Sequence, residues 1–260
     1  MSETPSLNSL EPAVGRMIPV APCTFTMGSP PREPERDTEE TQHTVRLTRR
    51  YAIGATPVTQ AQWTAVMPVN PSRFAKGPDA PQRPVESVNW YDVVRYCNVL
   101  SAKLGLAAAY EIGLGEEPEV ACDFSAPGLR LPTEAEWECA ARAGAAHRYA
   151  GGDDLNAVGW YNGNSEGSTR PVAQKLPNAW GLYDMSGNVW EWCWDGHDRY
   201  PAAPPEGAGD PTGNASSPRR VLRGGDWSYD ASYARVAFRR YNGPDFSYDR
   251  IGFRLARTLG

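Results

Sequence analysis

The sequence predicts a single α+β domain that is rich in loops and short regular elements. Glycine and proline, with 25 and 24 residues, make up close to a fifth of the 260 residues, which is typical of a fold with frequent turns. Nine tryptophans and a hydrophobic content of 40% can fill one core of this size. No segment reads as a linker, so we expect a flexible leader over residues 1–16 and one domain over 17–260.

Three segments carry the signals of helices. Each follows a Thr or Asn whose side chain can accept a hydrogen bond from the first turn, and glycine follows two of them closely. In the longest, apolar residues recur at spacings of three and four. In the last, Thr133 and Glu136 form a capping-box pattern. The predicted helices cover residues 60–67, 90–104 and 134–143.

Strands are predicted over 18–27, 43–47 and 51–53, where apolar and polar residues loosely alternate. Residues 30–42 are charged and contain proline, which indicates a solvated loop. The stretch 151–220 reads as mostly irregular, with an insertion loop over 201–217. Within it, Trp190, Trp192 and Trp194 alternate, which favours packing in a core or sheet over a sugar-binding platform.

Charge and cysteine usage exclude several classes of protein. A net charge of -5 argues against a nucleic-acid partner, which usually meets a basic face. Five scattered cysteines without metal-ligand spacing indicate buried free thiols in a reducing compartment. The N-terminus has no signal-peptide pattern and no run is long enough to span a membrane. We therefore expect a cytoplasmic protein, and export or display by another route stays open. We also expect a monomer.

Five segments resemble the formylglycine-generating-enzyme family, also called the sulfatase-modifying factors, over residues 17–257. They are TPVTQAQW, PVESVNWYDVVRYCNVLSAKLG, RLPTEAEWECAARAG, PNAWGLYDMSGNVWEWCWD and the pair RVLRGGDW with GFRLA. The resemblance implies a variant of the C-type lectin fold. It does not by itself imply the activity, because one fold hosts many functions.

The resemblance also allows the oxidase chemistry to be tested residue by residue. Aerobic members bind copper through two cysteines in the pattern GGS-aromatic-x-C-x4-C, and these two positions are Tyr229 and Ala234 here. A phenol and a methyl group cannot supply the thiolates that Cu(I) prefers. Other oxidase relatives use a histidine-rich iron site, and the three histidines form no such cluster. We expect no copper, no iron and no catalysis.

The C-terminal segment 220–256 resembles the variable region of proteins diversified by a diversity-generating retroelement. In that group, adenines of a template are copied unfaithfully, and the resulting NNY codons never encode Lys, Glu, Gln, Met or Trp. Between Asp226 and Arg250 the first four are absent, and Trp227 occupies a frame position. The resemblance implies a surface that displays varied side chains for binding protein or other ligands. The predicted ligand-binding residues are Ser228, Tyr229, Asp230, Ser232, Tyr233, Arg235, Phe238, Tyr241, Phe246, Ser247, Tyr248 and Asp249.

Such a surface requires a fixed frame beneath it. A position that accepts both Phe and Asp cannot lie in a core, where cavities and unpaired polar groups are costly. We expect the predicted residues to share one exposed face and the frame residues Trp227, Ile251 and Phe253 to be buried. The frame arginines Arg223, Arg239 and Arg254 should pair with acidic or carbonyl groups below.

Three alternatives stay open at this point. The aromatic tail could be an ordinary loop packed on its own domain. The chain could be an oxidase of the family with an atypical site, or a scaffold or regulatory domain without a diversified surface. A structural calcium site is also implied by related domains, with ligands at the side chains of Asp184 and Glu191 and the carbonyls of Gly187 and Val189.

Overall fold

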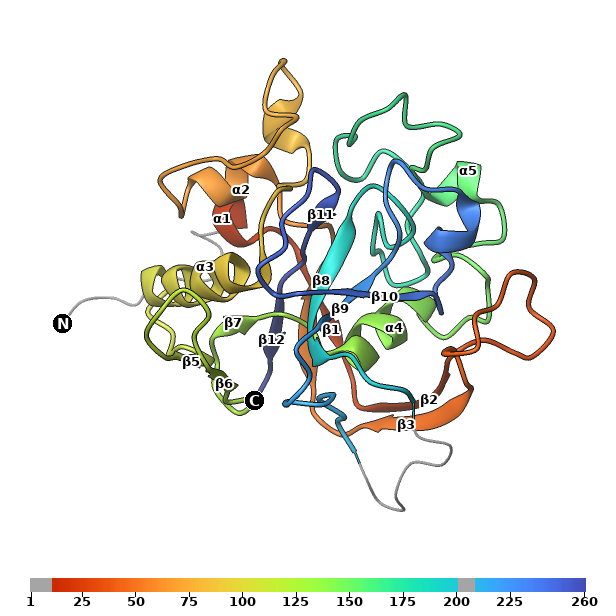
Figure 1. Ribbon diagram of the computed structural model, residues 1–260, viewed down its shortest axis with the longest axis horizontal. Coiled ribbons are helices and arrows are strands. Elements are labelled where there is room, and N and C mark those ends of the chain that lie inside the picture. Colours follow the sequence, from red (N-terminus) through yellow and green to blue (C-terminus); the bar gives the residue numbers. More distant parts are fainter. Residues whose placement is uncertain (1–10, 201–208) are drawn as a thin grey trace.

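The computed structural model describes residues 11–200 and 209–260, which fold into short helices and strands joined by long irregular segments (Figure 1). The helices are α1 (Glu11–Val14), α2 (Gln60–Thr64), α3 (Trp90–Lys103), α4 (Glu134–Arg142) and α5 (Leu155–Val158), with 3-10 turns at Ala80–Gln82 and Ala231–Ala234. No helix within these two ranges combines the length and apolar content of a membrane span.

The strands form two four-stranded sheets and two ribbons. One sheet has the order β1 (Met17–Val20), β4 (Tyr51–Gly54), β12 (Ala256–Thr258) and β7 (Leu129–Arg130). The central sheet has the order β10 (Arg239–Asn242), β9 (Arg220–Arg223), β8 (Trp190–Gly196) and β11 (Ile251–Gly252). The ribbons are β2 (Cys23–Met27) with β3 (His43–Leu47) and β5 (Tyr110–Ile112) with β6 (Val120–Cys122).

The C-terminal segment supplies three of the four strands in the central sheet. β9 pairs antiparallel with β8 and β10, and β11 pairs in parallel with the first two residues of β8. The two loops that separate β9, β10 and β11 therefore start and finish on a hydrogen-bonded platform. This placement fixes the ends of the predicted variable loops.

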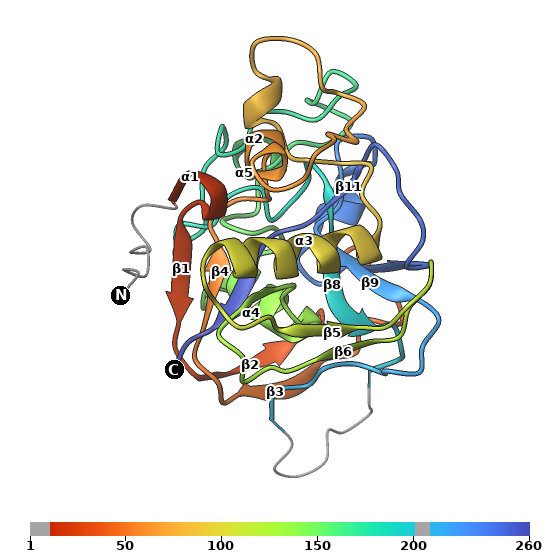
Figure 2. The same ribbon diagram turned by 90° about the vertical axis from the view of Figure 1, so that its left-hand side faces the viewer.

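β8 is the centre of the core, and all seven of its residues are buried. Trp190, Trp192 and Trp194 pack in the apolar cluster that contains α3, whereas Cys193 packs in the cluster that contains α4. Figure 2 shows α3 crossing in front of β8 and β9. Because one sheet contributes to both clusters, the described residues form a single domain, and the three tryptophans are core residues as predicted.

The three predicted helices are present with their predicted caps. Thr59, Asn89 and Thr133 each accept a hydrogen bond from the third residue of the helix that follows. α2 is shorter than predicted, since it ends at Thr64. Pro68 follows closely, and the residue before a proline disfavours helical dihedrals.

The predicted strand over 18–27 is wrong as one element. The chain forms β1 and β2 instead, separated by Ala21 and Pro22, and the two strands belong to different sheets. Proline has no N–H to donate to a ladder, which favours a break there. β3 is predicted correctly, and β4 is one residue longer than predicted.

The segment 151–220 holds α5 and β8 and is otherwise irregular where it is described, much as predicted. Side chains satisfy its backbone: the Asn178 side chain donates to two carbonyls of α4 and accepts from the N–H of Leu182. Within the predicted leader, residues 11–14 form α1, and residues 1–10 lie outside the described ranges. The same holds for 201–208 of the predicted insertion loop.

Candidate ligand-binding surface

Two glycines turn the chain out of β9 and onto the surface. Gly224 and Gly225 have φ angles of 97° and 77°, which only glycine adopts at low cost. A Cβ on Gly225 would lie 2.8 Å from the Cα of Ala234, and one on Gly224 would lie 3.2 Å from the ring of Trp137. The turn is therefore specified by both its conformation and its close packing.

Aspartates hold the first loop, which runs from residue 226 to 238. The Asp226 carboxylate accepts hydrogen bonds from the N–H groups of Ser228 and Tyr229 at 2.6 and 3.2 Å. Asp230 accepts one from the N–H of Ser232 at 2.9 Å. Short polar side chains that bind the following backbone in this way stabilise turns without a regular ladder. The loop therefore has a defined backbone.

The rings of this loop contact one another above β8. The centroid of Tyr229 lies 4.7 Å from that of Tyr233, which lies 4.9 Å from that of Phe238. The rings of Tyr229 and Phe238 also contact Trp190, at 6.4 and 5.9 Å. These spacings are those of edge-on and tilted aromatic pairs.

The second loop, residues 243–250, is tied to two other parts of the chain. The carbonyls of Pro244 and Tyr248 accept hydrogen bonds from the N–H groups of Trp90 and Ser87, and the Asp249 carbonyl accepts one from the Trp227 indole. Phe246 and Tyr248 are 42% and 44% exposed, and their rings lie 5.8 Å apart.

The structure brings many of the predicted ligand-binding residues together, but not all of them. Asp230, Phe246, Ser247 and Tyr248 are exposed, and Ser228, Tyr229, Ser232, Tyr233, Phe238, Tyr241 and Asp249 are partly buried. We call the surface formed by Tyr229, Tyr233, Phe238, Phe246 and Tyr248 the display face.

Tyr241 lies apart from the display face. Its ring packs 4.0 Å from that of His197 and 4.7 Å from the Arg219 guanidinium. Residues of a strand alternate between its two sides, so Tyr241 faces away from its neighbours Arg240 and Asn242. The expectation of one shared face is therefore wrong for Tyr241.

Arg235 is also not a surface residue, and its prediction as a displayed side chain is wrong. It is fully buried, and its guanidinium binds the carboxylates of Glu40 and Glu33 at 2.7–2.8 Å. Burial opposes ionisation of Glu40, but the hydrogen bonds and the positive charge of Arg235 outweigh it and lower the pKa of Glu40. Arg235 fastens the loop over 30–42 to the scaffold.

The frame predictions are mostly confirmed. Ile251 and Phe253 are buried. Trp227, predicted to be buried, is only partly so. It stands between the two loops with its ring edge-on to Phe74 at 5.4 Å, and its indole bonds the carbonyl of Asp249. It spaces the loops apart and is not part of the core.

All three frame arginines pair with glutamates below the surface, as predicted. Arg223 binds Glu134 and Glu138, Arg239 binds Glu134, and Arg254 binds Glu191. Arg223 also donates to the carbonyls of Val236 and Ala237, so it links helix α4 directly to the first loop.

Glu134 is the central acid of this buried network. Burial raises its pKa, but the charges of Arg239 and Arg223 outweigh that effect and bring it down to about 2. The carboxylate therefore stays ionised at neutral pH. Breaking one member of such a network leaves an uncompensated buried charge, so the floor of the surface tolerates little change.

A cavity of about 180 Å³ opens within the display face. We call it the hollow; it is lined by Trp190, Tyr229, Arg240, Asn242, Phe246, Tyr248, Arg250 and Ile251. The sequence reading missed the polar members of this set. The alternation within β10, which sends Arg239 inward and Arg240 outward, is the signal that could have identified Arg240 and Asn242.

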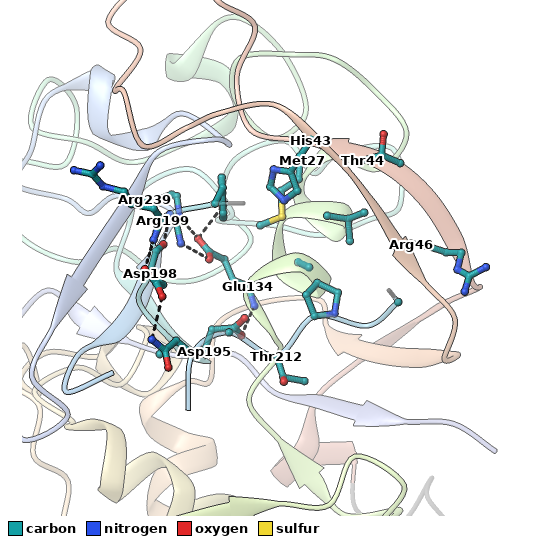
Figure 3. Close-up of a pocket in the computed structure, with 18 residues that line it drawn as sticks. Met27, His43, Thr44, Arg46, Glu134, Asp195, Asp198, Arg199, Thr212 and Arg239 are labelled. Carbon is teal, nitrogen blue, oxygen red and sulfur yellow. Dashed lines mark hydrogen bonds and ion pairs between the residues drawn. The ribbon is translucent and has the colours of Figure 1, made fainter. Parts of the chain in front are cut away.

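A larger cavity, of about 390 Å³, has Arg239 in its wall (Figure 3), whereas the hollow has Arg240. Glu134, Asp195, Asp198 and Arg239 line the larger cavity, and none of the twelve predicted residues does. Burial, together with the charge of Glu134, raises the pKa of Asp195 to about 8. Tyr200 and Gly209, which also line this larger cavity, flank the segment 201–208, which lies outside the described ranges.

Arg254 binds the side chain of Glu191, one of the predicted calcium ligands. The Glu191 carboxylate accepts two hydrogen bonds from Arg254 and one from the Trp137 indole, all at 2.6 Å. Asp184 accepts from the N–H of Ala173 at 2.8 Å, and burial raises its pKa to about 6. Within the described ranges, no three His, Cys, Asp or Glu side chains gather as metal ligands. Calcium at this site stays a prediction.

The two positions that the resemblance aligns with the copper ligands of the aerobic enzymes are Tyr229 and Ala234. Tyr229 lines the hollow, and Ala234 is buried against Gly225. The sulfurs of Cys23 and Cys139 do lie 2.9 Å apart, on β2 and α4.

Comparison with known proteins supports this architecture. Residues 3–259 match the model of the sulfatase-modifying factor enzyme 1-like domain. The chain is 36% identical to the chaperone protein LppX of Paenibacillus barcinonensis, over 72% of this chain and 73% of that protein. It is 34% identical to the formylglycine-generating enzyme of Thermomonospora curvata, over 76% of this chain and 65% of the enzyme.

Among solved structures, variable protein 1 of Treponema denticola, a variable protein of a diversity-generating retroelement, superposes with a TM-score of 0.85 at 37% identity. The match covers 94% of this chain and 95% of that one. PvdO from Pseudomonas aeruginosa superposes with a TM-score of 0.74 at 28% identity, over 94% of both chains. The chain belongs to the sulfatase-modifying factor enzyme 1-like family, and it has the C-type lectin-like fold of that family.

Proposed function

We propose that this protein is a non-catalytic binding protein whose display face recognises a protein or another ligand. The observation that carries the proposal is the contrast between the aromatic display face and the buried scaffold beneath it. Aromatic side chains stand on loops with defined backbones, while buried arginine–glutamate pairs and Ile251 and Phe253 fix the scaffold beneath.

The chemistry of the face suits recognition. Tyr and Phe offer a large contact area with few rotatable bonds, so little conformational entropy is lost on binding. Phe246 and Tyr248 are exposed beside the partly buried rings of the display face, and an exposed apolar patch usually marks a binding site. The likeness to a retroelement variable protein over most of the chain supports the same function.

A combinatorial library tests the proposal without knowledge of the natural ligand. NNY codons are placed at the surface positions Ser228, Tyr229, Asp230, Ser232, Tyr233, Phe246, Ser247 and Tyr248 of the displayed full chain. A matched control library places the same codons at the buried Arg235, Val236, Ile251 and Phe253. We expect most surface variants to stay folded, as measured by protease resistance, and most control variants to unfold.

Selection of the surface library against a single protein, such as lysozyme, should then yield binders that depend on the changed residues. If the surface variants unfold as often as the control variants, the face is part of the core and the proposal fails. A neighbouring reverse transcriptase gene, with a repeat of the segment encoding 220–256 that differs at adenines, would establish natural diversification.

A second candidate function is an oxidase with an atypical site, and the proximity of Cys23 and Cys139 favours it. Thiolates are the ligands that Cu(I) prefers. Incubation with copper, oxygen and a CxPxR peptide separates the two functions. We expect no aldehyde above the blank. Aldehyde formed by the wild type and lost in Cys139→Ser would identify an enzyme.

A further inference from the structure

The hollow contains two arginines that differ from those beneath it. Arg130, Arg223, Arg235, Arg239 and Arg254 each bind a glutamate in the interior. Within residues 11–200 and 209–260, neither Arg240 nor Arg250 has an ion pair with a carboxylate. Both are partly exposed.

Aromatic rings hold these two guanidinium groups in place. Arg240 lies 4.9 Å from the ring centroid of Tyr229 and 5.7 Å from that of Trp190. Arg250 lies 5.6 Å from the rings of both Tyr229 and Tyr248, and it donates to the Ser228 hydroxyl at 3.2 Å. Stacking of this kind orients a guanidinium but leaves its charge unneutralised.

The neighbouring acids balance these charges only in part. No described Asp or Glu lines the hollow. Asp249 forms an ion pair with Arg73. Asp226 is buried beneath the loop, where its carboxylate accepts hydrogen bonds from Ser228 and Tyr229. Burial raises the pKa of Asp226, and the positive charge of Arg250 opposes that rise, so Asp226 balances part of the Arg250 charge from below the hollow. A chain with a net charge of -5 therefore presents a local positive site.

The size of the hollow limits what can enter. An engineered cavity of about 150 Å³ holds one benzene molecule, so 180 Å³ fits a single ring or a side chain of similar size. Trp190, Ile251 and Phe246 supply apolar walls, and Arg240, Arg250 and Asn242 supply donors. Guanidinium groups bind carboxylate and phosphate groups through two parallel hydrogen bonds.

We infer that the hollow is the specificity pocket of the display face and that it binds one anionic group, a carboxylate or phosphate, carried on a ring or short apolar stem. This inference rests on the proposed binding function and names the ligand chemistry. Arg240 and Arg250 bind the anion, and the aromatic walls contact the apolar part.

The test uses the full chain and four small probes of similar size. Benzoate and phenyl phosphate carry the two anions, benzyl alcohol is the neutral control and benzylammonium is the cationic control. Binding is followed by titration calorimetry and by the NMR signal of the Trp190 indole N–H, which has no acceptor among the described residues. A blocked Ala-Glu-Ala peptide tests whether the carboxylate of a protein side chain binds in the hollow as benzoate does.

We expect both anions to bind at least tenfold more tightly than benzyl alcohol and to weaken as salt is added. Arg240→Gln and Arg250→Gln should each lower the affinity for benzoate about tenfold, which corresponds to about 1.4 kcal/mol. The matched control Arg32→Gln removes the same charge from an exposed loop position and should leave the affinity unchanged. Thermal unfolding verifies that each variant is folded.

Three outcomes overturn the inference. The first is an affinity for benzyl alcohol equal to that for the two anions. The second is a higher affinity for benzylammonium than for the anions, and the third is that none of the probes binds. Each of them leaves the library experiment unaffected, so a failure of the anion pocket is distinguishable from a failure of the display face. Should the arginine variants unfold, the probe preference and the salt dependence of the wild type still decide the matter.

Discussion

Arg239 and Arg240 are neighbours on β10, yet they serve opposite sides of it. Arg239 binds the buried Glu134 at 2.6–2.8 Å, and Arg240 stacks against Tyr229 at the hollow. The strand therefore separates a scaffold arginine from a surface arginine within one residue. A variable surface can be built directly on a core in this way, because side chains alternate along a strand.

Replacement of Arg235 tests whether this residue belongs to the scaffold. Arg235→Ser introduces a residue that an NNY codon can encode, and it leaves Glu40 buried and unpaired. We expect a loss of about 3–5 kcal/mol in the free energy of unfolding, measured by urea denaturation. Ser232→Ala, on the surface of the same loop, is the control and should change it by about 0.5 kcal/mol or less. A loss below about 1 kcal/mol for Arg235→Ser would return this position to the displayed set.

The second stability prediction concerns the exposed rings. Phe246→Ala combined with Tyr248→Ala should cost about 1 kcal/mol or less, because both side chains already contact water. Phe253→Ala, a ring of the same kind in the core, should cost about 3–5 kcal/mol. Chemical denaturation of the three proteins gives the comparison. Similar losses for both changes would mean that the exposed rings support the fold.

Local signals in the sequence were sufficient for the helices and the central tryptophans. The caps at Thr59, Asn89 and Thr133 act within four residues of the chain, and the alternation of the tryptophans is a property of one strand. Long-range pairing was not accessible. Arg235 meets Glu40 across 195 residues, and no local pattern distinguishes a buried arginine from an exposed one.

The hollow was missed for a related reason. β10 has four residues, which is too short for its alternation to stand out in a segment without a clear period. Arg240 becomes a surface residue only because β9 pairs with this strand and Glu134 binds its neighbour. Tyr241 was predicted as a displayed residue for the same reason. Tyrosine is a typical residue of the displayed set, and the alternation along β10 that turns Tyr241 away from Arg240 was not recognised.

The thiols of Cys23 and Cys139 should form a disulfide under mild oxidation. Their sulfurs lie 2.9 Å apart, and the hydrogen bond from Cys139 lowers the pKa of Cys23, which favours the reactive thiolate. Diamide should accept the two hydrogens and lower the mass by about 2 Da. Peptide mapping should place the link between β2 and α4. Cys139→Ser should abolish it, whereas Cys97→Ser should not. Retention of all five free thiols would contradict this prediction.

The dependence of stability on pH should reveal Asp195. Burial and the charge of Glu134 raise its folded pKa to about 8, whereas an unfolded aspartate has a pKa of about 3.9. Between these values the folded state holds a proton that the unfolded state has lost, so stability falls as the pH rises. Asp184, with a pKa of about 6, adds to the fall only below that pH.

Asp195→Asn should therefore make the free energy of unfolding nearly independent of pH between pH 6 and 8, measured by urea denaturation. Asp198→Asn, an exposed neighbour whose pKa is lowered by the N–H of Arg199, should keep the wild-type slope. Parallel curves for Asp195→Asn and the wild type would show that Asp195 is ionised in the folded protein.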